Sequence, residues 1–119
     1  MIAIPANVRI FLANKPVDGR KSFHGLSALV ESEFNQVPTS GDLFVFLSKR
    51  GNQVRLLYWD RDGFWLMAKR LEAGTFRRVR NGDDTAAKVE IDAADFTMLL
   101  EGVDARDVRR SKRYKLAAA

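Results

Sequence analysis

The sequence contains no cysteine, a single histidine and only three prolines among its 119 residues. The absence of cysteine excludes disulfides and thiol catalysis, and with one histidine it also excludes a zinc site built from Cys and His side chains. The longest apolar runs, such as LFVFL, are far too short to span a bilayer, and the first residues lack the pattern of a signal peptide. We therefore expect a soluble, cytoplasmic protein with no membrane contact.

Positive charge, in contrast, is in excess. Twenty Lys and Arg residues oppose fifteen Asp and Glu residues, which gives a formal net charge of +5. Residues 42–80 carry nine basic and four acidic residues, residues 81–103 carry one and six, and residues 104–119 carry six and two. Such a distribution is typical either of a protein that binds a polyanion or of ordinary solvated surface.

Apolar periodicity and turn residues predict a single-domain α+β fold, in which an antiparallel β-meander sheet of about four to six strands packs with two short helices. Strands are expected at 8–13, 42–49, 53–59, 64–71 and 88–91, with a further short strand at 75–79. Helices are expected from Ser22 to about Gln36 and after Asp92, because both polar residues suit an N-cap. Residues 1–103 would form the compact domain, and residues 104–119 a basic, mobile tail.

The segment YWDRDGFW at residues 58–65 places large aromatic residues on two neighbouring strands of the expected meander. Successive side chains of a strand point to opposite faces, so both faces of this hairpin are apolar and each needs a cover from a helix or from a partner. We expect most of these aromatics to lie in the core or in an interface. The candidate partner-binding residues are Tyr58, Trp59, Phe64 and Trp65.

Basic residues follow the same hairpins and also crowd the C-terminal segment. Guanidinium and ammonium groups bind phosphates through charge and hydrogen bonds without reading base sequence. The candidate DNA-binding residues are Arg50, Lys69, Arg70, Arg77, Arg78, Arg109, Arg110, Lys112, Arg113 and Lys115.

No residue pattern indicates an enzyme, a metal site or a cofactor. Asp60 and Asp62 satisfy the chemistry of a hairpin turn, and Arg61 between them would partly neutralise a cation site. His24 shares one side of its expected helix with Ser27 and Glu31, and neighbours on a helix face splay outward instead of converging on a substrate. We therefore expect no catalytic residue and no cofactor.

Three blocks of the chain resemble one protein family: RIFLANKPVDGRKSFHGLSALV, GDLFVFLSKRGNQVRLLYWDRDGFWLMAKRLEAGTF and FTMLLEGVDAR. From about residue 7 to residue 106 they are similar to TnpB of insertion-sequence family 66, the product of the second reading frame of these bacterial elements. This family is distinct from the RNA-guided nuclease that is also called TnpB. The positions that match its blocks are Lys15, Pro16, Asp18, Arg20, Phe44 to Phe46, Arg50, Gly51, Trp59, Asp60, Asp62, Gly63, Lys69, Arg70 and Leu71.

The chain departs from the family pattern at two places. Gly19 stands where the family has Met, and FRRVR, residues 76–80, replaces an ending with Trp and Pro. If the missing Trp contacts a partner, this copy has lost that contact, whereas the added arginines favour binding to phosphate.

The resemblance implies a non-catalytic accessory protein for DNA transposition, with the strand-cutting chemistry carried by the larger transposase of the element. Element DNA and that transposase are therefore the expected partners, and a homo-oligomer is left open. Two alternatives remain. One is a pure protein–protein interaction module without DNA contact, and the other is a metal-dependent nuclease that uses Asp60 and Asp62.

Overall fold

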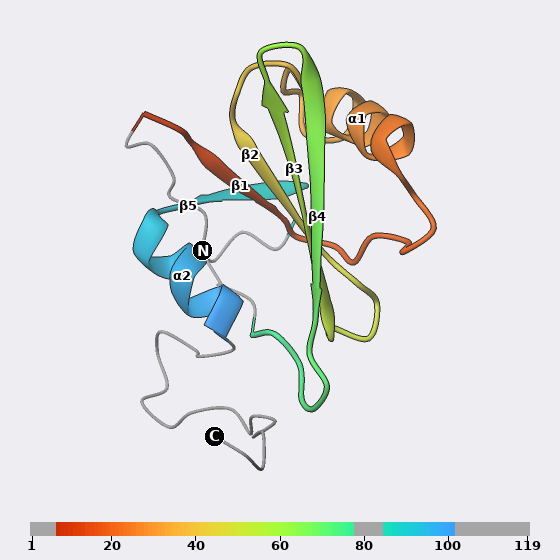
Figure 1. Cartoon of the computed structure of the whole chain (residues 1–119), viewed down its shortest axis with the longest axis vertical. Coiled ribbons are helices and arrows are strands. Elements are labelled where there is room, and N and C mark those ends of the chain that lie inside the picture. Colours follow the sequence, from red (N-terminus) through yellow and green to blue (C-terminus); the bar gives the residue numbers. More distant parts are fainter. Residues whose placement is uncertain (1–6, 78–84, 102–119) are drawn as a thin grey trace.

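The computed structural model describes residues 7–77 and 85–101. Its strands form one five-stranded sheet in the order β4-β3-β2-β1-β5 (Figure 1). The strands are β1 Ile10–Ala13, β2 Leu43–Leu47, β3 Gln53–Asp60, β4 Gly63–Arg70 and β5 Lys88–Ile91, and the helices are α1 Phe23–Ser32 and α2 Ala93–Glu101. The predicted α+β fold is confirmed.

The first strand lies inside the sheet, between β2 and β5. β1 pairs in parallel with β2, with Phe11 beside Phe44, and antiparallel with β5, with Phe11 beside Glu90. A parallel pair needs a crossover connection, and α1 supplies it between β1 and β2. Strands β2, β3 and β4 follow one another in antiparallel order, as the predicted meander requires. The sheet is therefore mixed, but mostly antiparallel.

The two helices pack on opposite faces of the sheet. On the face that we call the α2 face, Leu99 belongs to the same hydrophobic cluster as Val45. On the other face, the α1 face, Leu26 belongs to a second cluster together with Phe44 and Phe46. Both faces of the meander are apolar, as expected, and a helix packs on each of them.

The ends of the helices follow from local hydrogen bonds. α1 ends at Ser32 instead of near Gln36, because Asn35 adopts a φ of 52° and the Gln36 N–H donates back to the Val30 carbonyl at 3.2 Å. Ser22 precedes α1 as expected but makes no side-chain capping hydrogen bond. Asp92 does cap α2, since its Oδ1 accepts a hydrogen bond from the Asp95 N–H at 2.7 Å.

The short strand expected at 75–79 is not formed by residues 75–77, and residues 78–79 lie outside the described part. The chain returns instead to the turn between β2 and β3. There the N–H of the buried Phe76 donates to the Gly51 carbonyl at 2.7 Å. Hydrophobic burial of Phe76 decides this path, because its ring joins the α2-face cluster.

Candidate functional site

Three segments rich in basic residues meet at one end of the sheet. β1, β2 and β4 end there and β3 begins there, since β1 and β2 are parallel and β3 is antiparallel to β2 and β4. The segments 14–22, 48–52 and 69–77 therefore lie together. We call this region the basic end, and its basic residues are Lys15, Arg20, Lys21, Lys49, Arg50, Lys69, Arg70 and Arg77.

Backbone hydrogen bonds hold the three segments against one another. The Val17 N–H donates to the Leu47 carbonyl at 2.9 Å, which fixes the first segment beside the end of β2. The Leu71 N–H donates to the Asn52 carbonyl at 2.8 Å, so the third segment is bound to the second. The side chains of the basic end are thus displayed by loops with defined positions.

Arg55 of β3 is the residue that ties the first segment to the sheet. Its guanidinium donates to the carbonyls of Asp18, at 2.8 Å, Gly19, at 3.3 Å, and Lys21. The side chain is only 8% exposed, and this burial lowers the pKa of Arg55, while the nearby Asp18 carboxylate acts in the opposite direction. A guanidinium remains charged in proteins, so three carbonyl oxygens satisfy an otherwise costly buried cation.

The first segment also contains a local ion pair. Arg20 donates from its side chain and from its backbone N–H to the Asp18 carboxylate, with the shortest distance at 2.9 Å. The side-chain hydrogen bond, followed by the backbone one, lowers the pKa of Asp18 to about 2. Asp18 is therefore ionised at neutral pH and compensates the charge of Arg20.

The other basic residues of this end fall into two groups. Lys69 donates from Nζ to the Leu100 carbonyl in the last turn of α2 at 2.8 Å, and Arg70 lies 3.9 Å from the Glu72 carboxylate. Within residues 7–77 and 85–101, Lys69 and four further basic side chains of the basic end have no carboxylate at ion-pair distance, and the four are Lys15, Lys21, Lys49 and Arg50. These four, unlike Lys69, are not engaged by the Leu100 carbonyl either.

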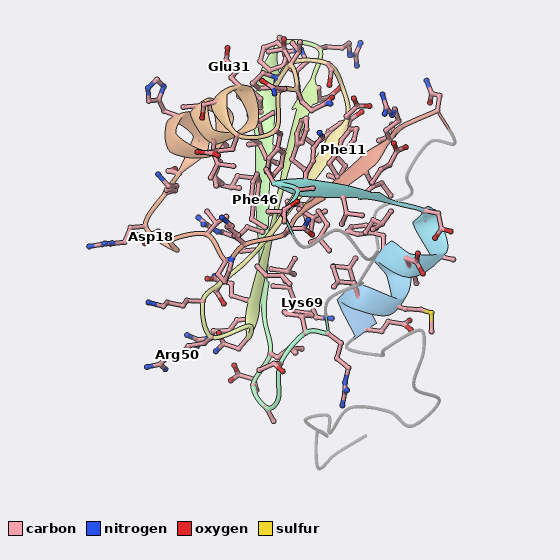
Figure 2. All side chains as sticks on the ribbon, turned by 180° about the vertical axis from the view of Figure 1, so that it is seen from behind. Phe11, Asp18, Glu31, Phe46, Arg50 and Lys69 are labelled. Atoms are coloured by element: carbon pink, nitrogen blue, oxygen red, sulfur yellow. The ribbon has the colours of Figure 1, made fainter. Side chains whose placement is uncertain are left out.

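The opposite end of the sheet carries mainly negative charge. It includes the end of α1, the start of β2, the β3–β4 turn and the end of β5, and we call it the acidic end. Figure 2 shows Glu31 of α1 at the top of the molecule and Arg50 and Lys69 in its lower half. The acidic residues of this end are Glu31, Glu33, Asp42, Asp60, Asp62, Glu90 and Asp92, and its basic residues are Arg9 and Arg61.

The four candidate partner-binding aromatics do not form one surface. Tyr58 packs with the α2-face cluster, and Trp65, its cross-strand neighbour, is on the same face and 59% exposed. Trp59 and Phe64 lie on the α1 face, where their rings meet edge to face at 5.0 Å. Trp65 is therefore the only one of the four that presents most of its side chain to solvent.

The acidic turn between β3 and β4 behaves as a turn. The Trp65 indole N–H donates to Asp60 Oδ2 at 3.4 Å, and Arg61 Nε lies 4.0 Å from Asp60 Oδ1. Among the described residues, no group of three or more His, Asp or Glu side chains is placed to hold a metal ion. Asp60 is thus engaged by its neighbours in and beside the turn.

Comparison with known proteins identifies the family of this chain. The family model described as "IS66 Orf2 like protein" matches residues 8–110. The chain belongs to the IS66 Orf2-like family. Two similar relatives come from Sinorhizobium fredii (strain NBRC 101917 / NGR234). The uncharacterized protein y4jC is 38% identical over 112 residues, which cover 92% of this chain and 92% of the relative. The uncharacterized protein y4hO is 31% identical over 113 residues, which cover 95% of this chain and 96% of the relative. No solved structure matches.

Membership in the IS66 Orf2-like family confirms the resemblance seen in the sequence and supports a role associated with transposition. The family is not a known enzyme class. Neither helix of the described residues is long and apolar enough to cross a membrane.

One of the blocks that carry the family resemblance lies at the basic end. The block around Lys15, Asp18 and Arg20 is the segment held by Arg55. Gly19 lies in the same segment, and a Cβ at this position would be 3.9 Å from Gln53 Oε1. A larger side chain at residue 19 would therefore lie against β3.

Sequence reasoning located only part of the basic end. It named Arg50, Lys69, Arg70 and Arg77, which the fold brings together, but not the basic residues of segment 14–22 or the buried Arg55. A signal for Arg55 was present, because a lone charge alternates with Leu57 on an apolar face and must find partners there. The remaining candidates lie outside the described residues: Arg78, Arg109, Arg110, Lys112, Arg113 and Lys115.

Proposed function

We propose that this protein is a non-catalytic accessory factor in DNA transposition that binds the DNA backbone through its basic end. The observation that carries the proposal is the convergence of eight Lys and Arg residues from three sequence segments on one end of the sheet, with acidic residues gathered at the other. Family membership supplies the setting in transposition.

The charge arrangement suits phosphate contacts. Exposed Lys and Arg side chains neutralise phosphates and release condensed counterions, which makes such binding strong at low salt and independent of base sequence. Lys15, Lys21, Lys49 and Arg50 have no carboxylate at ion-pair distance among the described residues, so they need not break an ion pair there to reach a phosphate.

The separation of charge also gives binding a direction. DNA repels the acidic end and attracts the basic end, so the protein approaches with the ends of β1, β2 and β4 facing the duplex. Arg55 and the backbone hydrogen bonds between the three segments then keep the basic side chains in place. In this mechanism the fold orients the protein, and the exposed cations supply the affinity.

The test is fluorescence anisotropy with a labelled duplex from an element end, titrated at several salt concentrations. Arg50→Gln should raise the Kd about threefold at low salt, and the double variant Lys49→Gln/Arg50→Gln should raise it about tenfold and reduce the slope of log K against log salt by about 2. Arg61→Gln is the matched control, because it removes the same charge from the acidic end. Equal effects of Arg50→Gln and Arg61→Gln would contradict the proposed orientation.

One observation favours the alternative of a protein-interaction module, namely the 59% exposure of Trp65 on an edge strand. Exposed Trp residues are frequent anchors of protein interfaces. In this alternative, the labelled duplex binds only when the purified transposase is present, and Trp65→Ala weakens the ternary complex while Lys49→Gln/Arg50→Gln does not.

A further inference from the structure

The two edges of the sheet differ in length. β5 has four residues, whereas β4 has eight, and in the described part of the chain no strand pairs with the outer side of β4. Alternate residues of an antiparallel strand direct their N–H and C=O groups away from the neighbouring strand, so β4 presents a row of backbone groups that no described strand satisfies.

β4 also lacks most features that protect an edge from pairing. It contains no proline, and its register with β3 is continuous from Gln53–Arg70 to Asp60–Gly63, without a bulge. Charged side chains occur only at its last two positions, Lys69 and Arg70. Long edges of this kind are templates for another strand.

We propose that β4 pairs with β4 of a second copy of this chain. The two strands are antiparallel and are related by a two-fold axis that passes beside Leu66. Residues that face each other across strands must lie on the same face of the sheet. Leu66 packs on the α1 face, whereas Trp65 and Met67 are cross-strand neighbours of Tyr58 and Leu56 on the α2 face. With the axis at Leu66, this residue meets the partner's Leu66, and Trp65 meets the partner's Met67.

Charge complementarity selects both the second copy and this register. Asp62 precedes β4 and Arg70 ends it, so an antiparallel pair centred on Leu66 places Arg70 opposite the partner's Asp62, twice by symmetry. A shift of the register by two residues in either direction would remove both Arg70–Asp62 pairs.

Dimerisation would explain two features of β4 at once. The exposed indole of Trp65 would be covered by the partner's Met67, and the outward backbone groups would be satisfied. The dimer would have one continuous sheet. Because the two copies are antiparallel, their basic ends would lie at opposite ends of this sheet. Two copies could then contact two DNA segments, although the dimer itself does not depend on DNA binding.

The first test is sedimentation velocity of the purified full chain without DNA over a wide concentration range. We expect a species of twice the 13.4 kDa chain mass. Asp62→Arg and Arg70→Asp should each raise the dimer Kd about tenfold, whereas the double variant should return it to within about threefold of the wild type. A chain that stays monomeric at all concentrations overturns the proposal, as does a dimer whose Kd is unchanged by both single variants.

The second test uses the absence of cysteine from the chain. Leu66→Cys should form an intermolecular disulfide under mild oxidation, because the two-fold axis brings this residue to its own copy within disulfide distance. The matched variant Ala68→Cys should not, because in this register residue 68 faces the partner's Phe64. Circular dichroism checks that both variants are folded. A cross-link at residue 68, or none at residue 66 in folded protein, contradicts the proposed axis.

Discussion

The two ends of the sheet use their charges in different ways. At the acidic end, Arg9 pairs with Glu90 at 2.9 Å, and Asp42 accepts hydrogen bonds from the Arg9 N–H and the Ser40 hydroxyl. At the basic end, five of the eight basic side chains have no carboxylate at ion-pair distance among the described residues, namely Lys15, Lys21, Lys49, Arg50 and Lys69. Charges at the first end stabilise local structure, whereas many at the second remain available for a ligand.

The ends also differ in how their loops are held. The loop 14–22 at the basic end depends on a buried cation, Arg55, whereas the β3–β4 turn at the acidic end is a short hairpin connection. The loop that carries the charges of the basic end is thus stabilised by the hydrogen bonds of Arg55 beneath it. We therefore expect mutations beneath this loop to reduce stability more than mutations in the β3–β4 turn.

The largest expected effect is at Arg55. Arg55→Met should lower the free energy of unfolding by about 3 kcal/mol, because three backbone carbonyls lose their charged donor while the apolar surroundings are kept. Urea denaturation measures the change. Arg61→Met, an exposed arginine at the other end, should change it by less than about 0.5 kcal/mol. Equal effects of the two variants would show that Arg55 does not hold the loop.

A smaller effect of opposite sign is expected at the β3–β4 turn. Arg61 adopts a φ of 55°, a conformation that side chains disfavour and glycine tolerates, whereas Gly63 of the same turn does not adopt a positive φ. Arg61→Gly should therefore raise the unfolding free energy by about 0.5 kcal/mol. Asp62→Gly is the control, since it should lower stability slightly.

The smallest expected effect is the pH dependence of the Asp18–Arg20 pair. The pKa of Asp18 is lowered to about 2, so its contribution to stability is fully present above the ordinary carboxyl pKa of about 4 and is lost as the pH falls toward 2. Asp18→Asn should lower the Tm slightly at pH 6 and not at pH 2. A difference in Tm that persists unchanged at pH 2 would assign the effect to the amide substitution itself.

The same comparison can be made at the acidic end. Arg9 lowers the pKa of Glu90, chiefly through a side-chain hydrogen bond. Glu90→Gln should therefore lower the Tm at neutral pH, and this difference in Tm should disappear on acidification, as for Asp18→Asn. Both carboxylates are exposed, and solvent screening keeps both effects small. A much larger effect at Glu90 would indicate that the acidic end relies on its ion pairs more than its exposure suggests.

Much of the fold was predictable because its signals are local. Apolar alternation in 53–59 and 64–71 indicated two strands, and the expected cover of both faces corresponds to the packing of Leu99 on one side and Leu26 on the other. The parallel pairing of β1 with β2 was not predicted. It depends on which distant strands meet once α1 has crossed the sheet, and periodicity along the chain does not contain that information.

The candidate site was less predictable, because its residues are distant in sequence. Lys15, Arg50 and Lys69 belong to three segments that only the strand order brings to one end. Along the chain the charge appeared as a basic middle followed by an acidic segment. In the fold, the acidic Asp60 and Asp62 separate from the basic Lys69 and Arg70 because β4 is long enough to carry the two groups to opposite ends.

The helices, the meander and the family are encoded locally, because periodicity, turn residues and the order of blocks are properties of neighbouring positions. The place of β1, the burial of Arg55 and the separation of charge between the two ends of the sheet arise only when the chain has folded. Each of these depends on pairings between residues far apart in the chain, whose energies come from hydrophobic burial and hydrogen bonding in three dimensions.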